Sequence, residues 1–409
     1  MKPLVWTAGF LLMVCQLAGQ TPQGLIYGRV LTVDEQSYEG LIRWDIEEAF
    51  WDDSFSGIKT QNPNLEALTA AQIKALRDKE TTETKTWDFM SLWENPYPTH
   101  QHVFRCRFGN MARMEITGSQ GARIFFKDGT SLELEGGGDV GRRISVYETA
   151  SELTRLEWDR IDHIDFSAAP ADLWQDEPPL QALYGTVLTT QGAFRGYIQW
   201  DNEECLSTDM IEGKQGDRMR KFPFGAVAEI KLLSEDLTRV TLFNGRSYEL
   251  GHTDDLGKRN HGIVVKNLEV GRVIIPWKEF RFVRFEKEVP DSGPAYDRFP
   301  QPVDLYGTLL TQEGVAWEGK LTFDLSTQTD VEMLTGSQEG LRYYLPFGNL
   351  AYVERRNHQF CAVRLKNGDK LFLEESRQVT DENWGVLVRN KEQVTYVPWQ
   401  EIERINFTQ

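Results

Sequence analysis

The hexapeptide Tyr184-Gly185-Thr186-Val187-Leu188-Thr189 occurs three times in this chain in related forms. The other copies begin at Tyr27 (Tyr-Gly-Arg-Val-Leu-Thr) and at Tyr306 (Tyr-Gly-Thr-Leu-Leu-Thr). Each copy is followed by a glycine and then by an aromatic-Asp pair, and these pairs are Trp44-Asp45, Trp200-Asp201 and Phe323-Asp324. Self-similarity of this kind is the sequence signature of a repeat architecture. The sequence therefore predicts three tandem repeats.

Each repeat is itself doubled. An aromatic residue followed by apolar residues three and six positions later occurs twice per repeat, in the sets Phe108/Met111/Met114, Trp158/Ile161/Ile164, Phe224/Val227/Ile230, Trp277/Phe280/Val283, Phe347/Leu350/Val353 and Trp399/Ile402/Ile405. Repeat two shows the same duplication in its spacing, because Gly192 precedes Pro223 by 31 residues and Gly245 precedes Pro276 by 31. Each repeat is therefore expected to contain two similar halves.

Each half is expected to form about five short β-strands, because its runs are rich in β-branched and aromatic residues and are separated by turn residues. In repeat two the predicted strands are 184–190, 194–200, 204–211, 218–222, 228–233, 239–243, 247–251, 262–267, 272–276 and 281–285. Asn244-Gly245 and Asp128-Gly129 are hairpin dipeptides. The spacing of three after each aromatic residue predicts one helical or 3₁₀ turn before the last strand of a half.

Five short strands with one turn before the last describe a small barrel. Residues 187–201 (VLTTQGAFRGYIQWD) resemble the opening strands of Sm-like and other SH3-like small barrels. The resemblance extends, through short motifs, over nearly the whole chain after residue 20. It implies an all-β chain of six five-stranded SH3-like barrels, arranged as one pair per repeat. The residues with which Sm proteins form rings and read RNA have no clear match here, so the resemblance implies the fold and not the activity.

Residues 1–20 have the order of a secretory signal peptide: Lys2, an apolar run from Leu4 to Leu17, and then the small residues Ala18 and Gly19. The run is too short to span a bilayer as a helix. The sequence thus predicts an exported protein, periplasmic or extracellular, with no transmembrane segment in the mature chain. Removal of the signal leaves Cys106, Cys205 and Cys361, an odd number of widely spaced thiols, which predicts structural thiols and not a disulfide framework.

The mature chain is expected to divide into repeat one (24–166), a linker (167–182), repeat two (183–285), a second linker (286–304) and repeat three (305–409). Both linkers are rich in proline and acidic residues and have no periodic pattern. Repeat one is longer than the others because of an insertion at 58–104. Within it, 64–80 predicts a helix capped by Asn64, with Leu65, Leu68, Ile73 and Leu76 on one side. Long insertions in a scaffold often carry function.

The net charge and the absence of known catalytic motifs argue against several classes of function. The chain has 45 Lys and Arg against 62 Asp and Glu, a net charge of −17, which argues against nucleic acid as the partner. The sequence contains no HExxH, GxSxG, GxxxxGK[ST] or helix-opening GxGxxG motif, so no catalytic residue and no organic cofactor is predicted. His100-x-His102 places two imidazoles on one face of a strand, a possible metal pair that lacks a third ligand.

The densest polar cluster lies in repeat one, and its candidate binding residues are Trp44, Asp45, Glu47, Glu48, Trp51, Asp52 and Asp53. Clustered carboxylates of this kind can hold Ca²⁺, and two of them can act as acid and base in hydrolysis. Aromatic faces beside carboxylates can also bind a sugar or a peptide. The alternative is structural: Trp44 and Phe50 lie in the core, the carboxylates line a solvated loop, and Asp45 stabilises a turn that recurs in the other repeats.

The sequence therefore favours a non-enzymatic interaction or scaffolding protein of a bacterial cell envelope, which binds a protein or a glycan. Repetition without a recurring catalytic set supports this, because tandem modules mainly add binding area and avidity. The alternative is a carboxylate-based hydrolase or glycan-processing enzyme centred on repeat one, which would require a pocket holding two carboxylates about 5–10 Å apart.

Overall fold

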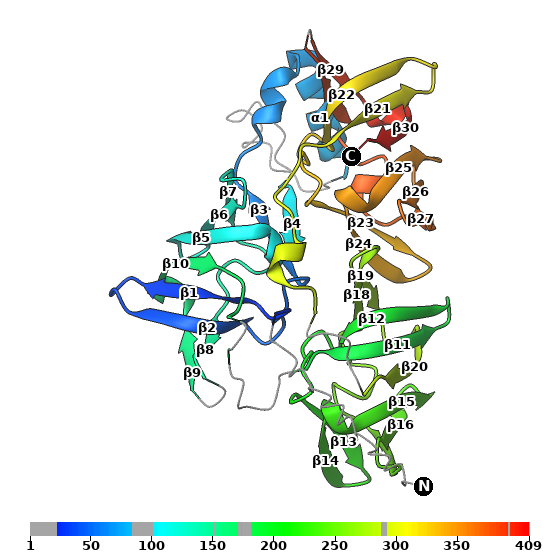
Figure 1. Ribbon diagram of the computed structural model, residues 1–409. Helices are drawn as coiled ribbons and strands as arrows, with labels where there is room; N and C mark the ends of the chain where they lie inside the picture. The colour runs from blue at the N-terminus through cyan, green and yellow to red at the C-terminus, as the bar shows by residue number, and fades with distance from the viewer. Residues whose placement is uncertain are drawn as a thin grey trace, which may run out of the picture.

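The computed structural model describes residues 23–83, 101–149, 152–170, 173, 181–287, 293–391 and 393–408, and in this part the chain is all-β with one α-helix (Figure 1). The strands lie in three antiparallel sheets of ten, twelve and eight strands. The predicted all-β class is confirmed. In Figure 1 repeat one lies on the left, and repeat two lies below repeat three on the right. The predicted signal peptide falls outside the described residues.

Each repeat contributes ten strands to the described part. In repeat one these are β1 (Tyr27–Thr32), β2 (Ser37–Trp44), β3 (Ser54–Lys59), β4 (Val103–Arg107), β5 (Met111–Gly118), β6 (Gly121–Phe126), β7 (Ser131–Glu135), β8 (Ile144–Tyr147), β9 (Leu153–Leu156) and β10 (Ile161–Phe166). In repeat two they are β11 (Leu183–Thr189), β12 (Ala193–Gln199), β13 (Met210–Gln215), β14 (Arg218–Pro223), β15 (Val227–Ser234), β16 (Leu237–Leu242), β17 (Ser247–Gly251), β18 (Ile263–Asn267), β19 (Gly271–Ile275) and β20 (Phe280–Phe285). In repeat three they are β21 (Tyr306–Thr311), β22 (Ala316–Phe323), β23 (Met333–Gln338), β24 (Leu341–Pro346), β25 (Leu350–Arg355), β26 (Cys361–Leu365), β27 (Lys370–Leu373), β28 (Val386–Arg389), β29 (Val394–Val397) and β30 (Ile402–Phe407).

In repeats one and two, the two halves of the repeat are intertwined in one sheet. The strand order is β4-β3-β7-β6-β5-β10-β1-β2-β8-β9 in repeat one, and repeat two has the equivalent order from β14 to β19. Exchanging the halves strand for strand (β1 for β6, β2 for β7 and so on) gives the same order read backwards. The topology is therefore that of an internal duplication.

The six separate barrels built from consecutive strands are not confirmed. The first strand of a repeat pairs with its last, as in Gly185 opposite Phe285, and the fifth strand pairs with the same last strand, as in Ile230 opposite Val283. These hydrogen bonds join the halves, and in repeats one and two the strands of each half are divided between two ends of one sheet. None of the three sheets closes into a barrel among the described strands.

The recurring Tyr-Gly pair marks a close approach of two backbones. A Cβ atom on Gly185 would lie 2.1 Å from the carbonyl oxygen of Arg284 in β20, and Gly28 and Gly307 face the same obstacle in their repeats. Only glycine permits this contact. The hexapeptide recurs because the first strand of every repeat must lie against its last.

The predicted turn before the last strand of a half is confirmed as a 3₁₀ turn at five of six places, which are η3 (Phe108–Asn110), η4 (Trp158–Arg160), η5 (Phe224–Ala226), η7 (Phe347–Asn349) and η9 (Trp399–Glu401). The sixth, at Trp277, is a hydrogen-bonded turn. Two further 3₁₀ turns are η6 (Tyr296–Arg298) and η8 (Arg377–Val379). The aromatic residue that opens each of the six turns is buried, as expected of core positions.

Repeats two and three share one sheet. The hairpin β23–β24 of repeat three adds to the edge strand β19 of repeat two, with Val273 opposite Tyr343. A Cβ atom on Gly271 would lie 2.2 Å from the carbonyl oxygen of Tyr344, so this junction needs a glycine at the start of β19. Glu152 and Gln393 hold the equivalent positions before β9 and β29, which are edge strands in the described part. The residue at this one position therefore differs between β19, which is paired with β24 and has glycine there, and the two edge strands β9 and β29, which have larger residues.

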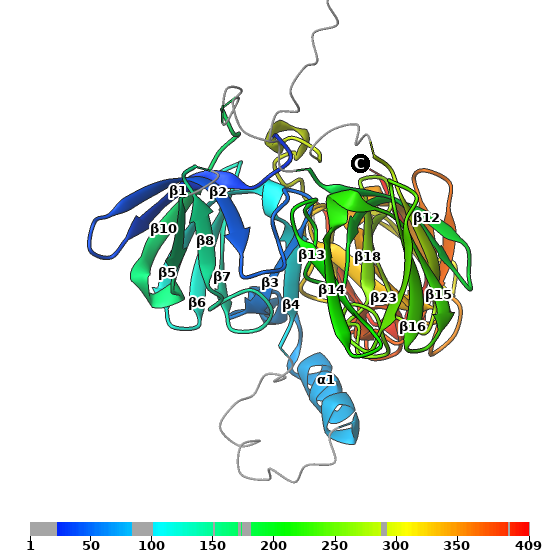
Figure 2. The same cartoon turned by 90° about the horizontal axis from the view of Figure 1, so that it is seen from below.

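The insertion of repeat one packs on repeat three. It contains η1 (Pro63–Ala67) and α1 (Ala70–Glu83), and α1 projects from the body in Figure 2. The predicted continuous helix from residue 64 is thus wrong at its start. Thr69 and Gln72 form a capping box, in which the amide of Thr69 donates to Gln72 Oε1 and the amide of Gln72 donates to Thr69 Oγ1, and this begins the helix anew. The predicted apolar side is nevertheless used, because Leu65, Leu68 and Leu76 cluster with three residues of repeat three, Leu325, Trp384 and Leu387.

Candidate functional site

The acidic segment that follows β2 begins with a left-handed turn. Asp45, Asp201 and Asp324 have φ values of 51°, 51° and 48°, a conformation that aspartate tolerates better than most residues. The recurrence of the aromatic-Asp pair is thereby explained. Asp45 also forms an ion pair with Arg142, at 3.2 Å. The structural interpretation of this aspartate is confirmed.

An acid at the end of the same loop holds the loop closed in all three repeats. In repeat one, Asp53 Oδ2 accepts hydrogen bonds from the amides of Ala49 (2.9 Å) and Phe50 (2.8 Å). In repeat two Asp209 Oδ2 accepts from the amides of Cys205 and Leu206, and in repeat three Glu332 Oε1 accepts from the amides of Gln328 and Thr329. Each carboxylate thus satisfies two backbone donors that the loop leaves without a strand partner.

Each of these loop-closing acids also binds a cation from a different repeat. Lys266 of repeat two donates to Asp53 Oδ1 at 2.6 Å and to Asp52 Oδ1 at 2.9 Å. Arg43 of repeat one lies 2.9 Å from Asp209, and Lys59 of repeat one lies 2.6 Å from Glu332. Asp52 and Asp53 therefore join repeat one to repeat two.

The ion pair at Lys266 is buried. The side chain of Lys266 is 2 % exposed, and those of Asp52 and Asp53 are 4 % and 1 % exposed. Burial by itself would lower the pKa of this lysine, but the charges of Asp52 and Asp53 outweigh it and raise the pKa. The amine thus stays protonated, and both carboxylates have a partner within the chain.

Glu47 and Glu48 take different positions. Glu47 lies where repeat one meets repeat two, and its Oε2 accepts from Asn202 Nδ2 at 3.2 Å. Burial raises the pKa of the Glu47 carboxyl. Glu48 is buried, and burial followed by the charge of Asp139 raises its pKa well above the usual range. Repeat two has the equivalent pair Glu204 and Asp255.

The two tryptophans of the cluster are core residues. Trp44 is fully buried, and its Nε1 donates to the carbonyl oxygen of Asp139 at 2.9 Å. Trp51 is also buried and packs against Tyr296, with ring centroids 4.5 Å apart. All seven candidate residues thus have contacts within the protein, and none of them lines the cavity described next. That these seven residues bind a partner molecule remains a prediction.

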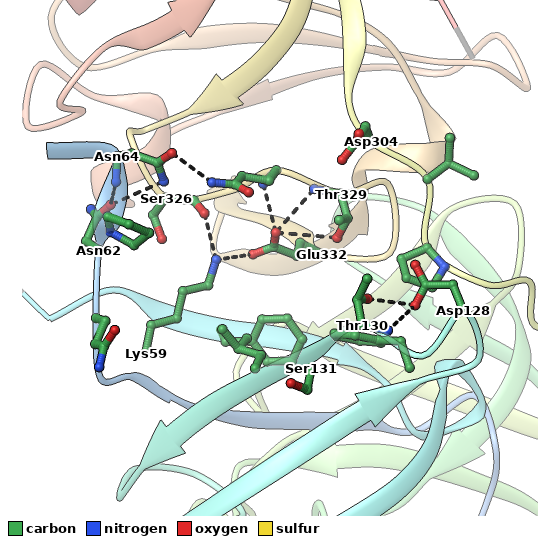
Figure 3. A pocket seen from close by; sticks show the side chains of 18 of the residues that line it. Lys59, Asn62, Asn64, Asp128, Thr130, Ser131, Asp304, Ser326, Thr329 and Glu332 are labelled. Carbon is green, nitrogen blue, oxygen red and sulfur yellow. Dashed lines mark hydrogen bonds and ion pairs between the residues drawn. The ribbon is translucent and has the colours of Figure 1, made fainter. Parts of the chain in front are cut away.

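A cavity of about 680 Å³ opens where repeat one meets repeat three (Figure 3). Its repeat-one wall comes from the insertion, with Lys59 and Asn64, and from the β6–β7 hairpin, with Asp128 and Thr130. Its opposite wall is the loop of repeat three that Glu332 closes, and the segment 301–304 forms a third side. Four segments, from repeat one, repeat three and the linker between repeats two and three, therefore build it.

Hydrogen bonds across the junction fix the shape of this cavity. Lys59 Nζ donates to Glu332 Oε2 at 2.6 Å and to the carbonyl oxygen of Ser326 at 2.7 Å. Asn64 Nδ2 donates to the carbonyl oxygen of Leu325, and Asn64 Oδ1 accepts from Gln328 Nε2 at 2.8 Å. Figure 3 shows the bonds of Lys59 to Glu332 and Ser326, which bridge the two repeats along one wall. The buried Phe104 and Phe126 add apolar surface.

The segment that precedes repeat three is fastened to repeat one. Lys127 Nζ donates to the carbonyl oxygens of Tyr296 and Phe299, both at 2.8 Å. Asn110 Nδ2 donates to the carbonyl oxygen of Pro300. The next residues, 301–304, are therefore held in place as the third side of the cavity.

Sequence reasoning located this site only in part. It singled out the insertion, which supplies Lys59, Asn62 and Asn64, and it recognised Asp128-Gly129 as a hairpin turn. It missed the contribution of repeat three, since no local pattern shows that Glu332 faces Lys59. The recurrence of an acid at positions 53, 209 and 332 is the signal that could have indicated a shared role.

No group of three or more His, Cys, Asp or Glu residues suited to a metal ion occurs in the described part of the chain. His100 lies outside that part, and His102 is buried with its Nδ1 3.8 Å from Asp324. Cys106, Cys205 and Cys361 are buried free thiols. Of the helices in the described part, none is both long and apolar enough to cross a membrane.

Comparison of the chain with protein-family models, with curated proteins and with solved structures gives no match in any of the three.

Proposed function

We propose that this is an exported, non-enzymatic interaction protein of the cell envelope, and that it binds a polar partner in the cavity between repeats one and three. The cavity itself carries the proposal: its volume of about 680 Å³ falls within the range of about 300–1,000 Å³ usual for ligand sites. Its walls come from two repeats and a linker, and domain junctions are frequent places for binding sites.

The state of the carboxylates supports binding over hydrolysis. Asp52 and Asp53 are held by Lys266, and Glu332 is held by Lys59. Glu48 and Asp139 have raised pKa values because of burial, as a general acid needs, but Glu48 is only 4 % exposed, and Asp139 Oδ2 accepts from both the amide and the hydroxyl of Ser56. A hydrolase would need its acid within hydrogen-bond reach of the substrate.

We further propose that the fold is a strand-exchanged form of SH3-like barrels. The set β20-β11-β12-β18-β19 places its strands in the order fifth, first, second, third and fourth by their positions within a half. A small barrel of the SH3-like kind would have this order within one half. Here the first two strands come from one half and the other three from its partner, with the 3₁₀ turn kept before the last strand.

The binding proposal is tested by blocking the cavity. Val303, which lines the cavity, is 50 % exposed, and Val33, far from it on the β1–β2 turn, is 57 % exposed. A Val303→Trp variant should lose the partners that the wild-type protein binds in thermal-shift screens of oligosaccharides and peptides, whereas Val33→Trp should keep them. Equal binding by both variants would refute this site. Release of product from chromogenic glycosides or peptides by the wild-type protein would favour the hydrolase.

A further inference from the structure

We infer that the ligand of this cavity is a neutral oligosaccharide, an inference that rests on the proposed binding function. Three properties of the cavity walls favour this class of ligand over other polar molecules: the balance of charge, the kind of polar group, and the apolar surface beside those groups.

The charges in the cavity are matched in pairs. Lys59 and Lys320 are the two cationic residues of its lining, and they pair with Glu332 at 2.6 Å and with Asp304 at 2.8 Å. An anionic ligand would have to compete with these carboxylates for the cations, and it would lie near the further carboxylate of Asp128. Desolvating an anion without a free cation is costly. The walls therefore favour an uncharged ligand.

The remaining polar groups suit hydroxyls. Amides and hydroxyls make up about half of the lining, and an amide both donates and accepts hydrogen bonds, as a sugar hydroxyl does. Gln61 and Gln301 are exposed. Asp128 is exposed as well, and its Oδ1 accepts from both the amide and the hydroxyl of Thr130. These two hydrogen bonds fix the orientation of the Asp128 carboxylate. Its second oxygen, Oδ2, accepts no hydrogen bond from the described residues.

Apolar surface lies beside these groups. The lining includes Phe104, Phe126, Leu132, Pro302 and Val303, and of these Val303 is the most exposed. A pyranose ring has polar edges and apolar C–H faces, so a wall that alternates amides with aliphatic carbon suits it. A peptide anchored by an apolar side chain would instead need a mainly apolar pocket.

The experiment is calorimetric titration of the full chain with neutral tetrasaccharides of glucose, mannose and N-acetylglucosamine, beside a tetrauronic acid and a neutral tetrapeptide. At least one neutral tetrasaccharide should bind, and the tetrauronic acid should bind at least tenfold more weakly. Asp128→Asn should weaken the neutral sugar by about fivefold, because a neutral amide replaces the charged acceptor while the turn with Thr130 can be kept. Asp217→Asn, at an exposed turn of repeat two, is the matched control and should leave the affinity unchanged.

The outcomes separate this inference from the proposed function. Sugar binding that is abolished by Val303→Trp and kept by Val33→Trp supports both. Binding of only the peptide or the uronic acid, again abolished by Val303→Trp, overturns the neutral sugar and leaves the cavity as the binding site. A ligand that binds Val303→Trp as well as it binds the wild-type protein overturns both.

Discussion

At the scale of single residues, the acids Asp53, Asp209 and Glu332 each perform two tasks. One carboxylate oxygen closes a loop by accepting hydrogen bonds from two backbone amides. The same carboxylate also binds a cation from another repeat. A charge-assisted hydrogen bond is stronger than a neutral one. The loop and the junction therefore depend on the same side chain.

Lys266→Met should destabilise the protein strongly, because it leaves Asp52 and Asp53 buried without their cation. Breaking a buried ion pair in this way costs about 3–5 kcal/mol. Arg239→Met is the matched control, since the pair of Arg239 with Glu249 is exposed and should contribute about 1 kcal/mol or less. Urea unfolding measures both, and equal losses for the two variants would contradict the account.

Glu204→Gln should stabilise the protein above neutral pH. Burial, and after it the charge of Asp255, raises the pKa of Glu204 to about 9, whereas an unfolded glutamate titrates near about 4.3. Between these values the unfolded chain releases a proton that native Glu204 keeps, so its contribution to stability falls as pH rises from about 5 to about 9. The glutamine variant removes this fall, which is about 1.4 kcal/mol per pH unit and so about 5 kcal/mol by pH 8.

Repeat three already contains the uncharged version of this site. Thr327 occupies the position of Glu204, and Gln378 accepts the backbone hydrogen bond that Asp255 accepts in repeat two. Denaturant unfolding of Glu204→Gln at pH 5, 7 and 9 provides the measurement. Glu235→Gln, on an exposed turn, should keep the wild-type pH dependence. An unchanged slope in Glu204→Gln would disprove the raised pKa.

At the scale of elements, the sequence predicts which segments form strands but not how they pair. The predicted strand 194–200 is β12 (Ala193–Gln199), and the predicted 228–233 lies within β15. The strand predicted at 204–211 begins only at Met210, because the preceding residues form the loop that Asp209 closes. The alternation of apolar and polar residues along a segment indicates a strand and its buried face. The pairing of that strand depends on partners that can lie about a hundred residues away, as for Gly185 and Phe285. The intertwined order could not be predicted from such local patterns.

Gly271→Gln should weaken the ladder between β19 and β24. The new Cβ would meet the carbonyl oxygen of Tyr344 at 2.2 Å, and the φ of +131° at this residue is strained for any side chain. Such strain costs on the order of 1–3 kcal/mol. Hydrogen exchange at the Arg342 and Tyr344 amides should accelerate by about tenfold or more, while exchange in β11 stays unchanged. Glu269→Gln, in the same loop but exposed, is the control.

At the scale of the whole molecule, three different contacts join the three repeats. Repeats two and three share the β19–β24 ladder, repeats one and two exchange ion pairs at Lys266 and Arg43, and repeats one and three meet through the insertion and Lys59. Figures 1 and 2 show the resulting arrangement, with repeat one beside the stacked pair. The cavity lies where repeats one and three meet, so no single segment of the sequence could indicate it.

The insertion should therefore control the geometry of the assembly. Leu68 and Leu76 are buried against Leu325, Trp384 and Leu387 of repeat three, and replacing both with glutamine places polar groups in that contact. Each such burial contributes about 1.5–3 kcal/mol, enough to detach α1 while the β19–β24 ladder still holds repeats two and three together. Small-angle X-ray scattering should then show a larger radius of gyration, and ligand binding in the cavity should weaken. Glu66→Gln, exposed on the same segment, should change neither. If the double variant keeps its dimensions, Lys59 and its bonds to Glu332 and Ser326 suffice to close the junction, and α1 only covers it.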